Sequence, residues 1–299
     1  MRTLLSISLM VVAAISIACA APDNAPELPP DFASLEARAA SGDADAAVQV
    51  GKMYLAGKGV PKDPAKALSY LQRAADQGNA AAQAGLGYLF AKGIAVAKND
   101  EMAREWFRKS AEQGYAKGEL NFGQFLRTGL GGEKDSAQGL TWITKAVDAG
   151  DKDAVFTLAE IYFLGDDGAL PDYKKAYSYA IVSAEAGNPG AQNIVGVCYR
   201  DGLGVERDRD KAEQWFLKAA EQGEAKAQSN LGHLIGVNCA DPARRLQATK
   251  WLVKAATQGE PMAKRTLGEV NPQIASALLI KEKAKQNRNA SSADGSGSH

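Results

Sequence analysis

The sequence predicts an all-α fold: a superhelical α-solenoid of about six helix-turn-helix repeats of 36 residues, with capping helices at its ends. The first observation behind this prediction is a periodic glycine. It recurs every 36 or 37 residues, at Gly42, Gly78, Gly114, Gly150, Gly187, Gly223 and Gly259. The second is that every interval between these glycines carries the same order of small, aliphatic and aromatic residues. Self-similarity at a fixed period is typical of stacked repeats.

The first helix of each repeat, helix A, is predicted from a column of small residues four places after the glycine. They are Ala46, Ala82, Gly118, Ala154, Ala191, Ala227 and Ala263. A large apolar residue and then a second small residue follow, as in Val50-Gly51 and Leu86-Gly87. This spacing places the apolar residues in one stripe of an α-helix. We expect the small residues to let a neighbouring helix approach closely.

The second helix, helix B, is predicted after a loop that begins with a glycine and ends with an acidic or amide residue. The glycines, expected to cap helix A, are Gly57, Gly93, Gly129, Gly165 and Gly202. The residues expected to cap helix B are Asp63, Asn99, Asp135, Asp172 and Asp208. Helix B carries an aromatic column: Tyr70, Trp106, Trp142, Tyr179, Trp215 and Trp251. We expect these rings to fill the gap between the two helices, with their N–H or O–H groups near water.

The sixth repeat departs from this pattern, because Asn238 replaces the capping glycine and Arg244 replaces the capping aspartate. Its loop should therefore follow a different path. The best-formed repeat runs from Asn193 to Gly223 and contains the Gly202-Leu203-Gly204-Val205 loop and the Lys218-Ala219-Ala220 helix end. This repeat resembles the Sel-one-like repeat, a relative of the tetratricopeptide repeat. The resemblance spans roughly residues 43 to 259. It implies a right-handed superhelix that displays a concave binding groove.

The ends of the chain predict the domain organisation. Residues 1–20 read as a signal peptide, with Met1-Arg2, an apolar stretch from Leu4 to Ala18, and a small-x-small cleavage pattern ending at Ala20. Residues 21–30 form a Pro-rich linker, residues 31–284 the repeat solenoid, and residues 285–299 a tail expected to be disordered. We expect an exported protein, periplasmic or extracellular.

Two alternatives for the N-terminus remain open. Cys19 is lipidated and anchors the protein to a membrane, or the signal is not cleaved. Association with a membrane is expected only in these two cases. At the other end of the solenoid, Ile274 to about Lys283 is predicted to form a final helix that buries Leu278, Leu279 and Ile280.

Charge and composition argue against several kinds of chemistry. Thirty-five basic and 35 acidic residues give a formal net charge of zero, which disfavours nucleic-acid binding. The two histidines, His233 and His299, form no cluster with the cysteines, so we expect no metal site and no cofactor. No Ser-x-x-Lys occurs, and we expect no catalytic residue. The alternative is a cell-envelope hydrolase, because some cysteine-rich members of the resembled family are β-lactamase-like.

Two cysteines, Cys198 and Cys239, need a separate interpretation. Cys198 occupies an apolar column of helix A, which favours a small buried hydrophobic residue. A disulfide with Cys239 is the other possibility in an oxidising compartment. The expected distance between the Cα atoms of Cys198 and Cys239 combines one spacing between stacked helices with the rise of about five helical residues. This distance exceeds the ~7 Å that a disulfide allows between Cα atoms. A bridge therefore requires the unusual sixth loop to fold back.

What remains is a surface for a protein or peptide partner. Three columns of helix A vary in residue type from repeat to repeat, at positions −3, +1 and +4 from the second small residue. In tetratricopeptide-like stacks this face lines the concave groove, and the resemblance implies the same here. The predicted groove residues are Lys52, Tyr88, Gln124, Arg127, Phe156, Glu160, Phe163, Asn193, Arg200 and His233. Aromatic and arginine residues often dominate the energy of interfaces, so the sequence predicts an interaction scaffold.

Overall fold

The fold is known from a computed structural model, which describes residues 32–166 and 169–277. These residues form α-helices and no β-strand. The chain divides into two compact units, Met1–Gln77 and Gly78–His299. The first unit contains α1 (Phe32–Ala40), α2 (Ala44–Ala56) and α3 (Pro64–Asp76). The second contains α4 (Ala80–Lys92), α5 (Asp100–Glu112), α6 (Ala116–Thr128), α7 (Ser136–Asp148), α8 (Lys152–Leu164), α9 (Tyr173–Glu185), α10 (Pro189–Asp201), α11 (Arg209–Glu221), α12 (Ala225–Gly236), α13 (Pro242–Thr257) and α14 (Pro261–Val270).

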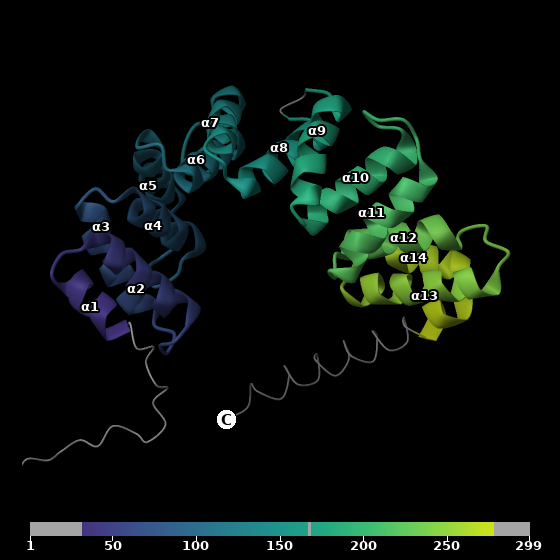
Figure 1. Ribbon diagram of the computed structural model, residues 1–299, viewed down its shortest axis with the longest axis horizontal. Helices are drawn as coiled ribbons and strands as arrows, with labels where there is room; N and C mark the ends of the chain where they lie inside the picture. Colours follow the sequence, from purple (N-terminus) through teal and green to yellow (C-terminus); the bar gives the residue numbers. More distant parts are fainter. Residues whose placement is uncertain (1–31, 167–168, 278–299) are drawn as a thin grey trace, which may run out of the picture. The chain divides into compact units, whose positions relative to one another are not determined.

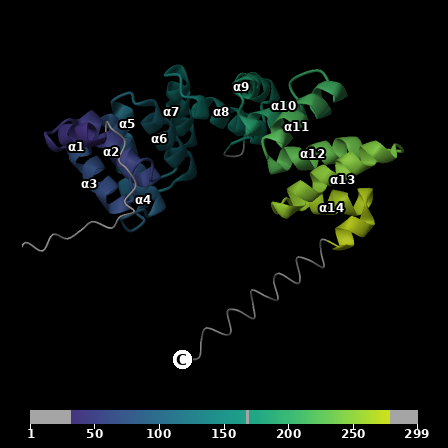
Figure 2. The same ribbon diagram turned by 60° about the horizontal axis from the view of Figure 1, so that its bottom comes forward.

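The helices pair into hairpins as the period predicts. Even-numbered helices from α2 to α14 are helices A, and odd-numbered helices from α3 to α13 are helices B; the two helices of each repeat pack on one another. In the second unit, α12, α13 and α14 lie side by side in both views (Figures 1 and 2). Several consecutive helices A also contact each other directly: α4 with α6, α8 with α10, α10 with α12, and α12 with α14. Consecutive helices B of this unit pack less closely, so the helices A line the inner side of the stack.

The helix ends follow from local hydrogen bonding. Asp208 shows the pattern shared by the five predicted caps of helices B: its Oδ1 accepts a hydrogen bond from the backbone N–H of Lys211 at 2.9 Å. Gly202 adopts a left-handed conformation with φ of 74° and donates its N–H to the carbonyl of Cys198. Gly165 is different from the other predicted glycine caps. Its φ is 79° but its ψ is 167°, and its N–H makes no capping bond to any residue that the structure describes. Helix α8 does end at Gly165 with a positive φ, as expected, but the extended ψ turns the chain away from the helix instead of forming the left-handed cap seen at Gly202.

The sixth loop differs from the others, as expected. Asn238 takes a positive φ of 56°. Asp241 caps α13 by accepting from the N–H of Ala243, and Pro242 occupies the first helical position. Helix α13 therefore begins before Arg244, the position where the other repeats carry their capping residue.

The small column of helix A makes close packing possible. A β-carbon on Gly87 would lie 2.6 Å from the ring of Phe107, and one on Gly196 would lie 2.6 Å from the ring of Phe216. The side chains that occupy this space belong to the column next to the predicted aromatic column. They are the buried residues Leu71, Phe107, Ile143, Ala180, Phe216 and Leu252. The prediction that the tryptophan column fills the gap was therefore wrong by one helical position.

The tryptophans are half-buried at the edge of the core instead. A lysine one turn later on the same helix covers each ring. The distances from Nζ to the ring centroid are 4.4 Å for Lys109 on Trp106, 3.9 Å for Lys145 on Trp142, 4.1 Å for Lys218 on Trp215 and 4.4 Å for Lys254 on Trp251. These are cation–π contacts. For Trp106 the expectation that the indole N–H stays near water was wrong, because its Nε1 is buried and has no hydrogen-bond partner among the described residues.

The N-terminal cap is confirmed. Helix α1 packs on α2, and its Glu36 accepts hydrogen bonds from the hydroxyls of Tyr54 and Tyr70 at 3.4 and 3.1 Å. After α14, residues 272–277 are helical and Ile274 packs on the last core cluster. The predicted signal peptide (1–20), the linker (21–30), the apolar residues 278–280 and the tail (285–299) lie outside the described residues. Across 32–166 and 169–277, no helix has the length and apolar character to cross a membrane.

Candidate binding surface on the helices A

The ten predicted groove residues lie in both units and differ in how far their side chains are exposed. Lys52 belongs to the first unit and is exposed on α2. The other nine lie on helices A of the second unit, and among them Tyr88, Glu160 and His233 are exposed while Asn193 is buried. The rest are half-buried: Gln124, Arg127, Phe156, Phe163 and Arg200. We call the surface carried by α4, α6, α8, α10, α12 and α14 in the second unit the helix-A face.

The first hollow on this face lies between α6 and α8 and has a volume of about 330 Å³. We call it the Arg127 hollow. Its lining residues are Gln124, Phe125, Arg127, Thr128, Leu130, Thr157, Glu160, Ile161, Leu164 and Gly165. Phe125 and Ile161 are buried beneath it, whereas Leu164 at its edge is 73% exposed. The hollow therefore combines an apolar lining with a few polar groups, as ligand pockets commonly do.

Arg127 is engaged inside this hollow. Its Nε and Nη2 each donate to a carboxylate oxygen of Asp166 at 2.9 Å, and the two side chains are 18% and 21% exposed. This two-point ion pair ties α6 to the loop after α8. The contact of Arg127 with a partner stays a prediction, and in the structure its guanidinium is engaged by Asp166. Glu160 stays exposed at the hollow, and desolvation raises its pKa, partly offset by Lys226 on α12.

The second hollow is bounded by α10, α12, α14 and the loop after α10, with a volume of about 500 Å³. We call it the Arg200 hollow. It is lined by Arg200, Asp201, Arg207, Arg209, Ser229, Asn230, His233, Leu234, Val237, Met262 and Thr266. Two of the predicted groove residues, Arg200 and His233, line it directly.

A chain of polar contacts organises the Arg200 hollow. Arg200 donates from Nε and Nη2 to Asp201 at 2.8 and 2.6 Å, and from Nη1 to Oδ1 of Asn230 at 3.0 Å. Asn230 in turn donates to Oδ1 of the buried Asn193 at 2.8 Å. The hydrogen bonds from Arg200 hold the pKa of Asp201 below its ordinary value. The predicted residue Asn193 thus supports the hollow from below instead of lining it.

The remaining predicted residues do not line either hollow. Phe163 packs edge-on against Tyr173 at 5.8 Å between ring centroids. Phe156 lies so close to Gly190 that a β-carbon there would be 2.6 Å from the ring. Both aromatics therefore stabilise the stack. Tyr88 is 48% exposed on α4, apart from the residues that line the two hollows.

The sequence interpretation missed one column of helix A. Thr157 and Asn230 both immediately precede the buried aliphatic residue of their repeat, and they line the Arg127 and Arg200 hollows respectively. The sequence did contain a signal for this column, namely a polar residue directly before the buried aliphatic residue. Arg207 and Arg209 were missed because they belong to the loop after α10 and the start of α11, outside the helix-A columns.

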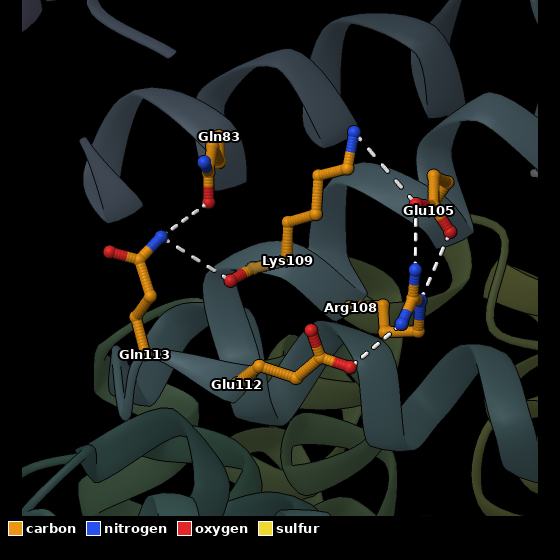
Figure 3. A network of polar contacts seen from close by, with 6 residues as sticks. All are labelled: Gln83, Glu105, Arg108, Lys109, Glu112 and Gln113. Carbon is orange, nitrogen blue, oxygen red and sulfur yellow. Dashed lines mark hydrogen bonds and ion pairs between the residues drawn. The ribbon is translucent and has the colours of Figure 1, made fainter. Parts of the chain in front are cut away.

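Hydrogen bonds between a buried glutamine of helix A and an exposed glutamine after helix B connect the two helices of several repeats. Gln113 donates to Oε1 of Gln83 at 2.7 Å (Figure 3), and the same pairing joins Gln222 to Gln192 and Gln258 to Gln228 at 2.8 and 2.9 Å. In Figure 3 the ion pairs of Arg108 with Glu105 and Glu112 lie along the same helix, α5. The glutamine pairs, unlike these ion pairs, join helix A to the C-terminal end of helix B.

The third repeat lacks this pair. Glu119 stands at the helix-A position and Ala149 at the helix-B position. The Oε2 of Glu119 is buried and has no hydrogen-bond partner among the described residues, and desolvation raises the pKa of this carboxyl group. The charge of Lys145 partly offsets this rise, whereas the charge of Asp148 adds to it, so ionising this carboxyl inside the helical stack costs free energy.

Two cysteines lie in the described part of the chain. Cys198 and Cys239 are both free thiols, and burial raises the pKa of Cys198 to about 12. In the described part of the chain, no three His, Cys, Asp or Glu residues come together in a way that would hold a metal ion.

Stacked helical hairpins with a chemically varied inner face define an α-solenoid of the kind that serves as a protein-interaction scaffold. The Sel1 repeat family matches this chain six times, at residues 44–79, 80–115, 116–151, 152–188, 189–224 and 225–260. The chain therefore belongs to the Sel1 repeat family, and the resemblance seen in the sequence is confirmed.

Solved structures agree with this assignment. A Sel1 repeat protein from Oxalobacter formigenes is 28% identical with a TM-score of 0.66, over 76% of this chain and 99% of that one. A protective antigen of uropathogenic Escherichia coli with an SLR fold is 32% identical with a TM-score of 0.65. That match covers 79% of this chain and 51% of the antigen, so the chain spans about half of the antigen's length. The comparison with curated proteins gave no match.

Proposed function

We propose that this protein is an exported interaction scaffold that binds a peptide or protein partner on its helix-A face and carries out no reaction of its own. The observation that supports this most is the presence of two hollows of different chemistry on one repetitive stack. The Arg127 hollow has an apolar lining and an arginine paired with Asp166, whereas the Arg200 hollow carries three arginines. Repeat architecture explains the stack, but it does not require these differences between repeats.

Two properties of the surface suit a polypeptide. Exposed apolar side chains such as Leu164 and Met262 stand at the edges of the hollows, and exposed leucine and methionine groups contribute to binding when a partner covers them. Amide groups such as those of Gln124 and Asn230 lie beside them and can pair with a peptide backbone. The volumes of about 330 and 500 Å³ suit side chains of a docked segment.

Export is the second part of the proposal and rests on residues 1–20 of the sequence. Expression of the full chain followed by N-terminal sequencing of the mature protein tests it. A mature protein that begins at Ala21 supports cleavage, and retention of residues 1–20 in a cytoplasmic fraction contradicts export. Lipid attached to Cys19 would instead establish the membrane-anchored alternative.

Partner capture tests the binding surface. The purified mature chain is cross-linked in an extract of its native host, and the captured proteins are identified by mass spectrometry. A triple variant of exposed helix-A residues, Tyr88→Ala, Glu160→Lys and His233→Ala, should lose the specific partner while keeping its helicity. These positions are preferable to Arg127 and Phe163, because Arg127 and Phe163 make internal contacts.

A matched control carries three substitutions on helices B: Met102→Ala, Val182→Ala and Glu221→Lys. All three residues are exposed, and this variant should retain the partner. Loss of the partner in the control but not in the helix-A variant would contradict the assignment of the surface. Turnover of nitrocefin by the purified protein, abolished by a single substitution, would favour the hydrolase alternative instead.

A further inference from the structure

We propose that the Arg200 hollow recognises aspartate or glutamate side chains in an acidic segment of the partner. This inference rests on the proposed function, because it names the chemistry of one part of the helix-A face. The hollow is lined by three arginines, Arg200, Arg207 and Arg209, against one carboxylate, Asp201. The lining of the hollow therefore carries two more positive than negative formal charges, whereas the chain as a whole has a net charge of zero.

The arginines differ in how far their donors are already used. Arg200 gives three hydrogen bonds to Asp201 and Asn230, so it mainly shapes the hollow. Arg209 gives one hydrogen bond, from Nη2 to the carbonyl of Leu234. Arg207 is exposed and makes no hydrogen bond or ion pair with any residue in the described ranges. Its positive charge helps to lower the pKa of Asp201. Donors on Arg207 and Arg209 therefore remain for a ligand.

These donors suit a carboxylate. A guanidinium presents parallel N–H groups that match the two oxygens of a carboxylate, and such pairs are stronger than neutral hydrogen bonds. Asp201 lies in the same hollow with a side chain that is 40% exposed. Its negative charge opposes a doubly charged phosphate more strongly than a singly charged carboxylate.

The rim of the hollow favours a peptide as the source of that carboxylate. Leu234, Val237 and the exposed Met262 offer apolar contacts, and Asn230 offers an amide. A nucleic acid would need a continuous positive track along the surface, and the neighbouring Arg127 hollow does not supply one. There, Asp166 already pairs with Arg127, and Glu160 adds a second carboxylate. The two hollows should therefore select different parts of one partner.

The test selects binders to the full mature chain from a random peptide library displayed without free C-termini. The proposal expects peptides enriched in Asp and Glu. For a selected peptide made synthetically with an amidated C-terminus, replacing its acidic residues with Asn or Gln should weaken binding about tenfold, because one charge-assisted contact is lost. The variant Arg207→Gln should weaken binding of the original peptide by a similar factor.

The matched control is Arg265→Gln. Arg265 is an exposed arginine on α14 that does not line the hollow, so this variant should bind like the original protein. Since Arg207 has no hydrogen bond within the described residues, Arg207→Gln should also keep the original helicity and melting temperature. Arg207→Glu should weaken acidic peptides further than Arg207→Gln does.

Each other outcome is decisive. Peptides that bind without acidic enrichment, lose binding in the Tyr88, Glu160 and His233 variant and tolerate Arg207→Gln would overturn the inference and leave the proposed function standing. Displacement of the peptide by inorganic phosphate at concentrations where acetate has no effect would assign the hollow to phosphate groups and overturn it. Binding that requires a free C-terminus would overturn the assignment to side chains. If no peptide binds and cross-linking captures no partner, the proposed function itself fails.

Discussion

Phe216 of α11 lies against Gly196 of α10 so closely that the glycine has no room for a side chain. A β-carbon on Gly196 would stand 2.6 Å from the ring, and the ring itself is fully buried. The same relationship joins Gly87 to Phe107 in the second repeat. This contact explains why the residue after the buried aliphatic one is small in every repeat. It also sets the distance between the two helices of a hairpin.

Substitution of Gly196 should therefore destabilise the protein even though alanine favours helices. We expect Gly196→Ala to lower the free energy of unfolding by about 1–3 kcal/mol, because the methyl group forces Phe216 out of a well-packed position. Urea denaturation followed by circular dichroism measures the change.

Gly268→Ala is the control for this experiment. Gly268 is a helical residue of α14 whose β-carbon would meet no atom within 4 Å. Alanine should stabilise this helix by roughly 0.5–1 kcal/mol through its higher helix propensity. Equal effects of the two substitutions would show that crowding at Phe216 does not decide the outcome.

The buried carboxyl group of Glu119, whose Oε2 has no hydrogen-bond partner within the described residues, should make stability depend on pH. Burial raises its pKa in the folded state, so the folded protein binds this proton more tightly than the unfolded chain does. The resulting penalty is absent below the unfolded pKa of about 4.3, grows as pH rises through the folded pKa, and is complete above it. Glu119→Gln should therefore stabilise the protein by roughly 1 kcal/mol at pH 8. The gain should shrink toward pH 4.

The reverse substitution supplies the comparison. Gln228 donates to the carbonyl of Ala220 and accepts from Gln258. Gln228→Glu should destabilise the protein at pH 8, and the loss should diminish as the solution becomes acidic. Thermal unfolding across this pH range measures both variants. A stability difference between Glu119→Gln and the original protein that stays constant with pH would contradict this account.

The ion pair between Arg127 and Asp166 should hold the fourth loop in place. A double-mutant cycle with Arg127→Met and Asp166→Asn should give a coupling free energy of about 1 kcal/mol, since the pair is partly buried and bonded at two points. Arg127→Lys should recover only part of it, because an ammonium group cannot make both bonds in that geometry. Proteolysis within residues 165–172 provides a local measurement, and it should become faster in the single variants. An unchanged cleavage rate would show that the pair does not position the loop.

The two free thiols should differ strongly in reactivity. Cys198 is fully buried, and its pKa is raised to about 12 by desolvation, so little thiolate forms at neutral pH. Cys239 is partly exposed in the sixth loop. In the mature protein, Ellman's reagent should modify Cys239 in the folded state and Cys198 only after unfolding. The variant Cys239→Ser should show no fast phase. Detection of a Cys198–Cys239 disulfide by mass spectrometry under non-reducing conditions would contradict the free thiols.

Much of the fold was predictable because its determinants are local or strictly periodic. Asp208 caps a helix through a hydrogen bond to the N–H three residues ahead, and Gly202 ends a helix through its own backbone conformation. Both relationships are visible in a short window of sequence. The small column is visible because it repeats with the period of the stack. The same logic identified the unusual sixth loop from Asn238 and Arg244.

It was harder to predict which of two neighbouring columns of helix B packs against helix A. Trp215 and Phe216 are adjacent in sequence, and both lie on the buried side of an amphipathic helix. Only the packing distance to Gly196 shows that Phe216 enters the gap while Trp215 stays at its edge under Lys218. A pattern of hydrophobic residues gives the side of a helix that is buried, but it does not resolve two neighbouring positions on that side.

The binding surface, too, was predictable from the sequence only in part. The amino-acid order alone was enough to place Arg127 and Arg200 on one face of the helices A. Residues at equivalent positions of successive repeats lie on the same face of the stack. It could not show that Arg127 is paired with Asp166, 39 residues away, or that Arg207 joins Arg200 in one hollow. Those contacts depend on how each loop folds over the next hairpin. They are long-range in sequence and specific to single repeats, so the period carries no information about them.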